Sequence, residues 1–475
     1  MNKKIILSYA VGPIGSAIVS FASVPLIAWF FTVEDVGKIS IFNAVVSLAT
    51  LVFCLGLDQA FAREYHGCKD KAALLKETIL PGAVLLLLLI VLTSIYDARL
   101  LSRLIFDESS KYLTVMVVVC FIAQYIARFL SLILRMQERA MAYSMSQLLP
   151  KVLFLLFLLT GVGLGYERNL KQLLTAYVLS ACLVFFIYLY NTRYDWLPAI
   201  KATTDEKQIK VLLKFGLPLV FGSLASWGLN VADRFFLRYY SSFSELGIYS
   251  VTMSVSAVAT LFAGIFNTIW APLVYRWLSE GKVDTQKIDN IGEHVLAAIY
   301  FAIVGCGLVS WIVPYLLPSQ YSPIEYLLPV CLFAPLLYTL SEVTAVGIAI
   351  SRRTMFSMLA SVTAMLCNLL GNYLLVPKYG AAGAATSTLL SFVLFYVLRT
   401  EFSKHVWRKI PTLKTYMAIG ILSIYVLFNL WVVKGGITMV GASLVLFALG
   451  CFIFLNSLKL TMVSLISILN KNKIQ

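Results

Sequence analysis

The stretch TILPGAVLLLLLIVLTSIY, residues 78–96, runs for 19 residues without a charged side chain. A hydrocarbon core about 30 Å thick is crossed by a helix of about 20 apolar residues, so this stretch predicts a membrane span. Lipid offers the backbone no hydrogen bonds, and a long apolar run therefore spans as a helix. Fourteen such stretches fill the chain, and we predict an all-α integral membrane protein. The predicted spans are 5–31, 39–62, 78–96, 112–134, 147–164, 170–189, 212–239, 248–273, 295–312, 324–350, 355–375, 381–398, 413–433 and 437–455.

The composition agrees with a chain embedded in lipid. Hydrophobic residues make up 60% of it and charged residues 13%, with a mean hydropathy of +0.86, whereas a soluble domain averages about 25% charged residues. A net charge of +15 would suggest nucleic acid in a soluble protein. Here the charge is explained by membrane orientation, and we expect no nucleic-acid partner. The eight cysteines and three histidines lack metal-ligand spacing, so we expect no metal and no cofactor.

Lysine and arginine are distributed unevenly between alternate connections. With the N-terminus in the cytoplasm, the inner connections hold 26 of the 38 basic residues and the outer connections hold 10, while Arg128 and Lys151 lie inside spans. Cytoplasmic loops carry the excess of Lys and Arg in membrane proteins, and an even number of spans returns the chain to the side where it began. We therefore expect a multi-pass protein of the bacterial inner (plasma) membrane with both termini cytoplasmic. Only three residues separate the last two spans, so the sequence leaves a choice between 12 and 14.

Short matches between the two halves indicate an internal duplication. The matches are Gly37 with Gly247, Ser40 with Ser250, Arg139 with Arg353, Met141 with Met355 and Ser180 with Ser391, at offsets of 210 to 214 residues. Six spans return the chain to its starting side, so the copies would be parallel and related by an axis along the membrane normal. We predict a six-helix lobe over 1–200, a cytoplasmic linker over 201–211, a second six-helix lobe over 212–404, and two further helices with a cytoplasmic tail over 405–475.

Polar residues inside spans are costly and usually face a cavity or a partner. The fourth predicted span carries Gln124, Arg128, Ser131 and Arg135, whose spacing of 4, 3 and 4 puts them on one helix face. A guanidinium can hold phosphate oxygens in a bidentate fork and stays charged. These four residues are therefore substrate-binding candidates. The alternative is that Arg128 reaches toward the membrane surface or pairs with another side chain.

Two further groups of polar residues are candidates for a site. In the seventh predicted span, Asn230, Asp233 and Arg234 approach the outer interface, where an aromatic belt follows, and they would bind a head group or lie at the interface. At the inner end of the second span, Asp58 and Arg63 would form a gate pair or cap a helix end. Glu342, in the tenth span, is a candidate carboxylate for coupling to a gradient of H⁺ or Na⁺. These gate and coupling candidates are Asp58, Arg63 and Glu342.

Three stretches resemble the polysaccharide exporters and O-antigen repeat-unit flippases of the multidrug/oligosaccharidyl-lipid/polysaccharide exporter superfamily. They are TVEDVGKISIFNAVVSLATLVFCLGLDQAFAREY (32–65), LLKFGLPLVFGSLASWGLNVADRFFLRYYSSFSELGIYS (212–250) and NYLLVPKYGAAGAATSTLLS (372–391). The resemblance implies two lobes around a central cavity, alternating access, and an undecaprenyl-diphosphate-linked glycan as cargo. It also implies membrane lipids, a polysaccharide polymerase and a chain-length regulator as partners.

Two other functions compete with this one. A multidrug-type exporter of the same superfamily would need a buried carboxylate for a cationic cargo, and the first span has none; the deepest charge is Arg128, which favours an anionic cargo. A membrane enzyme such as a polysaccharide polymerase would need a sizeable loop. The longest outer connection, 97–111, has 15 residues and no catalytic motif. We therefore do not expect an enzyme.

The charge distribution predicts the topology. Reporter fusions placed at Asn2 and at Gln475 should both report a cytoplasmic location, because the basic connections remain on that side. A periplasmic signal from the fusion at Gln475 would contradict the span count, and the error would then lie at the turn formed by Lys434, Gly435 and Gly436.

Overall fold

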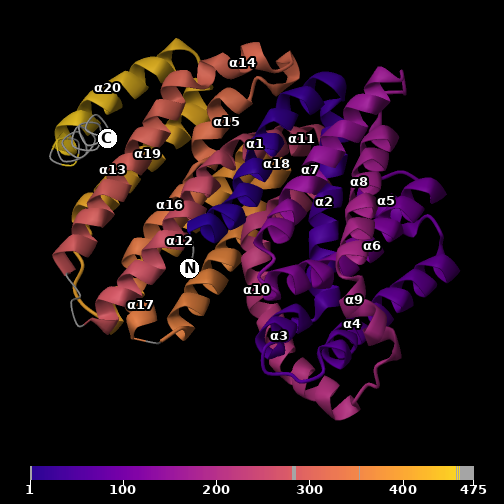
Figure 1. The fold of residues 1–475 in the computed structure, drawn as a ribbon. Helices are drawn as coiled ribbons and strands as arrows, with labels where there is room; N and C mark the ends of the chain where they lie inside the picture. The colour runs from indigo at the N-terminus through magenta and orange to yellow at the C-terminus, as the bar shows by residue number, and fades with distance from the viewer. Residues whose placement is uncertain (1–2, 281–284, 352, 456, 458, 460–475) are drawn as a thin grey trace, which may run out of the picture. The chain divides into compact units, whose positions relative to one another are not determined.

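The computed structural model describes residues 3–280, 285–351, 353–455, 457 and 459, and those residues contain helices and no strand (Figure 1). Eleven of the described helices are long and apolar enough to cross a membrane, and α20 (Ile437–Ile453) is a shorter apolar helix. The all-α membrane fold is therefore confirmed, while the count of fourteen spans stays a prediction. Nearly all of the chain after Leu455 lies outside the described residues.

The chain forms two compact units, Met1–Ser250 and Val251–Gln475. The helices of the first unit are α1 (Lys3–Phe30), α2 (Val33–Cys54), α3 (Leu57–Glu64), α4 (Lys71–Tyr96), α5 (Leu100–Phe106), α6 (Lys111–Met136), α7 (Ala140–Gly163), α8 (Leu170–Asn191), α9 (Arg193–Lys201) and α10 (Glu206–Tyr240). Helix α11 (Phe243–Ser256) begins in the first unit and ends in the second. The predicted lobes and linker, with boundaries at 200, 211 and 404, stay a prediction.

In the first unit, α7 packs along α1 and α8, and α2 packs against α6 and α10. Aromatic rings fill the space between α2, α3 and α6. Tyr125 meets Phe53 edge-on at 6.5 Å and Phe129 at 5.6 Å, and Phe129 meets Phe61 at 6.5 Å. These rings are almost fully buried. They hold α6 rigidly beside α2 and α3, which positions the polar face of α6.

The second predicted span, 39–62, is not one helix, which corrects the sequence interpretation. Leu55 and Gly56 adopt left-handed conformations with φ of 51° and 70°, and they separate α2 from α3. A Cβ added at Gly56 would overlap the carbonyl oxygen of Gly216 on α10, so only glycine fits this turn. The break redirects the chain, and α3 begins one residue before Asp58.

Two of the residue pairs matched by the predicted duplication, Gly37 with Gly247 and Ser40 with Ser250, lie at one contact within the first unit. A Cβ at Gly37 would overlap the carbonyl oxygen of Phe243, and a Cβ at Gly247 would overlap the carbonyl oxygen of Val33. Ser250 donates a hydrogen bond to Ser40 at 2.6 Å across the same contact, and the two serines stand 210 residues apart. The contact is reciprocal, as expected where a local two-fold axis relates two similar segments.

Two predicted connections contain helices. The stretch between α8 and α10 includes α9. At the C-terminal end of α9, Lys76 donates hydrogen bonds to the carbonyl oxygens of Ile200 (3.0 Å) and Ala202 (2.7 Å). A cation there satisfies carbonyls that the helix leaves unpaired. The outer connection 97–111 includes α5. Both short helices are packed on the first unit rather than extended from it.

The second unit is also all-helical in its described part. Its elements after α11 are α12 (Val258–Ser279), α13 (Thr285–Val309), η1 (Ser310–Ile312), α14 (Val313–Leu316), η2 (Ser319–Tyr321), α15 (Ile324–Cys331), α16 (Phe333–Thr344), α17 (Val346–Ile350), α18 (Met355–Val406), α19 (Leu413–Phe428), η3 (Asn429–Val433) and α20. Predicted spans eleven and twelve together form α18, which Gly380 interrupts with φ 52° and ψ −128°. Hydrogen bonds from Asn368 to Thr388 and from Ser387 to Asn368 join its two halves side by side.

The glycine contact between α2 and α11 predicts an unusual response to alanine. Replacing a helical glycine by alanine normally stabilises a helix by about 0.5–1 kcal/mol. Gly37→Ala should instead lower the unfolding temperature of the purified protein, since overpacking costs about 1–3 kcal/mol. Gly222→Ala on α10 is the matched control, because nothing lies within 4 Å of its added Cβ. Equal unfolding temperatures for the two variants in detergent would contradict this close contact.

Candidate functional site

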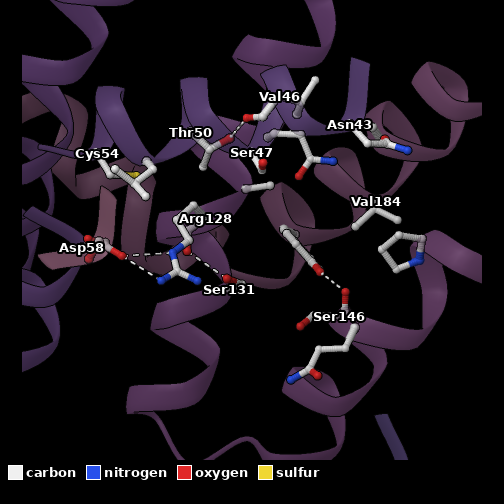
Figure 2. Close-up of a pocket in the computed structure, with 18 of the residues that line it drawn as sticks. Asn43, Val46, Ser47, Thr50, Cys54, Asp58, Arg128, Ser131, Ser146 and Val184 are labelled. Atoms are coloured by element: carbon white, nitrogen blue, oxygen red, sulfur yellow. Dashed lines mark hydrogen bonds and ion pairs between the residues drawn. The ribbon is translucent and has the colours of Figure 1, made fainter. Parts of the chain in front are cut away.

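A cavity with a volume of about 730 Å³ lies in the first unit (Figure 2). It is bordered by α2, α3, α6, α7, α8 and α10. Two charged side chains line it, Asp58 and Arg128, and most of its other polar lining is neutral. The neutral polar residues are Asn43, Ser47, Thr50, Gln59, Gln124, Tyr143, Ser131, Ser146, Gln147, Tyr177, Tyr188 and Ser223. Its volume is that of a site for a small organic ligand or a short oligosaccharide.

Arg128 forms an ion pair with Asp58. Its Nη2 lies 2.7 Å and its Nε 3.1 Å from Asp58 Oδ2 (Figure 2). The Asp58 side chain is 11% exposed and that of Arg128 is 44% exposed, so the carboxylate is the buried partner and the guanidinium borders the cavity. This pair explains how a charge within a span is tolerated. Asp58 pairs here with Arg128 and not with Arg63, and the gate role predicted for Asp58 and Arg63 stays a prediction.

Arg63 lies elsewhere. Its Nε is 3.4 Å from Glu64 Oε1, and its guanidinium lies over the Phe215 ring at 4.3 Å. Asp58 and Arg63 are five residues apart, on different faces of the short helix α3. The helix-end interpretation of Arg63 therefore fits the structure better than pairing with Asp58.

One edge of the Arg128 guanidinium remains open. The Nε and Nη2 groups both donate to a single oxygen of Asp58, and no hydrogen bond is recorded for Nη1 within the described part of the chain. A guanidinium has five donors in a planar fork. The edge formed by Nη1 and the second hydrogen of Nη2 can therefore accept a further anion in bidentate geometry.

The polar stripe of α6 faces this cavity. Gln124, Arg128 and Ser131 all line it, and Ser131 Oγ donates to the Arg128 carbonyl oxygen at 2.8 Å. Arg135, one turn farther along, lies in an adjoining hollow that shares Tyr143 and Gln147 with the cavity. The predicted face is therefore correct in geometry, and its role in substrate binding stays a prediction.

A second stripe, on α2, was missed in the sequence. Asn43, Ser47, Thr50 and Cys54 repeat at spacings of 4, 3 and 4 and all line the cavity. The same periodicity that identified the α6 stripe could have found them. These four side chains are uncharged and hardly reduce the hydropathy of the span, so a search for charged residues inside spans does not find them.

The candidates on α10 do not line the cavity. Asn230 is exposed and donates to the Ser226 carbonyl at 2.8 Å. Asp233 is buried and accepts a hydrogen bond from the Tyr249 hydroxyl, while Arg234 is half-buried. The Asp233 carboxylate therefore holds α11 against α10, which is a structural contact.

Glu342 belongs to a separate polar group in the second unit. Its Oε1 lies 2.7 Å from Arg399 Nη1, which also donates to Ser341 Oγ at 2.7 Å. Arg399 directly follows the predicted span 381–398 and so counted among the basic residues of an inner connection, but it is buried within α18. Glu342 stands 214 residues after Arg128, the offset that separates Arg139 from Arg353. Arg128 and Glu342 carry opposite charges, each neutralised by an ion pair, and their equivalence in the predicted duplication stays a prediction.

The chemistry of the cavity lining is that of a polar binding site. Among the described residues, no group of three or more His, Cys, Asp or Glu side chains could hold a metal ion. One fixed guanidinium and many neutral hydroxyls and amides surround the space. This arrangement suits a ligand with an oxyanion at one end and hydroxyl groups over the rest.

Comparisons with known proteins agree with this geometry. A family model described as "Polysaccharide biosynthesis protein" matches residues 3–277. "Lsg locus putative protein 1" of Haemophilus influenzae is 23% identical over 67% of this chain and 77% of its own length. "Probable low-salt glycan biosynthesis flippase Agl15" of Haloferax volcanii is 22% identical over 62% of this chain and 61% of its own length.

Solved structures show the same fold. The inward closed conformation of the lipid II flippase MurJ superimposes with a TM-score of 0.67 at 16% identity, covering 96% of this chain and 99% of that one. An inward-facing multidrug resistance MATE family transporter of the MOP superfamily gives a TM-score of 0.55 at 15% identity, covering 86% and 94%. With its family model spanning more than half of the sequence and this fold around a polar cavity, the chain belongs to the polysaccharide biosynthesis protein family.

Proposed function

We propose that this protein is a flippase that moves polyprenyl-diphosphate-linked oligosaccharide across the bacterial inner membrane for the synthesis of surface polysaccharide such as O-antigen. The observation that carries the proposal is the open edge of Arg128 in a cavity of otherwise neutral polar lining. A diphosphate is the part of such a cargo that a guanidinium fork binds best. The Haloferax relative named as a probable glycan biosynthesis flippase supports the same substrate class.

Asp58 has a defined part in this mechanism. Its carboxylate neutralises Arg128, which avoids an isolated charge in a medium of low dielectric constant. An arriving diphosphate would take the open Nη1 and Nη2 edge, and Asp58 would then compete with it electrostatically. The competition limits affinity, which favours release on the far side. The oligosaccharide would occupy the cavity, and the polyprenyl chain would remain in lipid.

Transport by alternating access requires contacts that can separate. The packing of Gly37 against Phe243 and of Gly247 against Val33 is made by backbone atoms, with one serine–serine hydrogen bond beside it. No long side chains have to rearrange when such a contact separates. The contact therefore suits a gate that opens and closes during transport. We propose that both termini are cytoplasmic, as the basic connections predict, and that a polymerase and a chain-length regulator act on the delivered cargo.

The driving force is proposed to be a gradient of H⁺ or Na⁺. Glu342 remains the coupling candidate, now with Arg399 as its partner at 2.7 Å. A carboxylate that is paired with a cation in one conformation and released in another would bind a proton or a sodium ion only after release.

Arg128 provides the direct test of the proposed function. In proteoliposomes, Arg128→Ala should reduce flipping of a labelled polyprenyl-diphosphate oligosaccharide at least about tenfold, a loss of about 1.4 kcal/mol in cargo stabilisation. Arg128→Lys should restore part of the rate, because it keeps the charge but loses the fork. Arg63→Ala is the matched control, since Arg63 lies outside the cavity lining. A normal rate for Arg128→Ala, at normal protein abundance, would contradict the role of Arg128.

Whereas Arg128 is expected to raise the affinity of the protein for a diphosphate, Asp58 is expected to lower it. Asp58→Asn keeps the shape of the side chain and removes the competing charge, so a soluble short-chain isoprenoid diphosphate should bind more tightly, by about three- to tenfold. Isothermal titration of the purified protein in detergent measures this change. Weaker binding by Asp58→Asn would mean that the carboxylate orients Arg128 for the ligand instead of competing with it.

A further inference from the structure

Three amide side chains in the cavity have no hydrogen-bond partner in the described part of the chain. They are Asn43 on α2, Gln124 on α6 and Gln147 on α7. Asn43 Oδ1 is also shielded from solvent and accepts no hydrogen bond. Buried polar groups normally have partners, and an unsatisfied one asks for an explanation. A ligand that supplies the missing hydrogen bonds is such an explanation.

Resting on the proposed function, we propose that this cavity selects an uncharged oligosaccharide, built of neutral hexoses or N-acetylhexosamines, and that Asn43, Gln124 and Gln147 recognise it. Each amide offers two N–H donors and a carbonyl acceptor. Sugar hydroxyls both donate and accept, and acetamido groups do the same, so amides are complementary to them. The three amides come from three different helices, and all three line the cavity.

The charge balance of the cavity favours neutral sugars over acidic ones. Asp58 and Arg128 are the only charged residues among its described lining, and they neutralise each other. Once the diphosphate takes the open edge of Arg128, no second cation in this lining is left for the carboxylate of a hexuronic acid. That carboxylate would enter the cavity without a cationic partner, and transfer of an unpaired charge from water is costly.

The dimensions fit an oligosaccharide rather than a single sugar. Asn43 and Cys54, which both line the cavity, are 11 residues apart on α2, which corresponds to about 16 Å along the helix. Asp58 and Asn43 lie toward opposite ends of the row of lining side chains (Figure 2). With the diphosphate bound at Arg128, the Asn43 end of the cavity is available to the sugar units that lie farther from the polyprenyl chain.

The test compares three cargoes on the unaltered full-length protein in proteoliposomes. Each carries the same polyprenyl diphosphate: one bears a neutral trisaccharide, one the same trisaccharide with a hexuronic acid in place of one hexose, and one no sugar. We expect the neutral cargo to flip at least about tenfold faster than the acidic one, equivalent to about 1.4 kcal/mol. Equal rates for the two glycans would overturn the inference and leave the proposed function standing. Movement of none of the three cargoes would instead overturn the proposed function.

Substitutions of the amide residues then test whether these residues cause the preference for neutral sugars. Asn43→Leu and Gln147→Met remove the amides with little change in volume, and each should slow the neutral glycan cargo about three- to tenfold, the loss expected for hydrogen bonds to an uncharged group, while leaving the sugar-free carrier unchanged. Gln320→Met is the matched control, because Gln320 is an exposed amide outside the cavity. If the amide variants slow the sugar-free carrier equally, or slow no cargo, the assignment of Asn43 and Gln147 is wrong. The cargo comparison on the unaltered protein decides the inference even if a variant fails to fold.

Discussion

A peptide group in hydrocarbon has no water to bond, and this constraint governs the whole chain. Every long segment in the described structure is a helix that satisfies its own backbone. At two of the breaks between helices, another stretch of backbone packs closely into the gap. Gly56 rests against Gly216, and beyond Gly380 the close approach of Gly383 to the Leu375 carbonyl packs the two halves of α18 together. The first of these breaks brings Asp58 within reach of Arg128.

The second constraint is the cost of a charge away from water. The first unit meets it with Asp58 and Arg128, and the second unit meets it with Glu342 and Arg399. The two pairs join different helices, α3 with α6 in the first unit and α16 with α18 in the second. An anionic cargo would meet an accessible cation in the first unit, where the guanidinium is the more exposed partner.

The sequence predicted the features that depend on local periodicity. Helical spans follow from runs of apolar residues, and the Gln124–Arg128–Ser131 face follows from spacing alone. The pairing of Asp58 with Arg128 joins residues 70 apart, and it depends on the turn at Leu55 and Gly56, which hydropathy does not register. The α2 stripe was missed because neutral side chains leave an apolar span looking uniform. Arg399 was misplaced because a charge near the end of a hydrophobic run resembles a loop residue.

The contact of Gly37 and Gly247 also limits which substitutions the sequence can accept during evolution. Each faces the backbone of the other's helix, so a larger residue at either position is accepted only after the opposite helix has moved. Substitutions in one segment must therefore be matched by changes in the other, even though 210 residues separate them. Recombination between relatives that exchanges only one half would join mismatched surfaces at this point. We therefore expect a chimera with a relative to fold only when residues 33–40 and 243–250 come from the same parent.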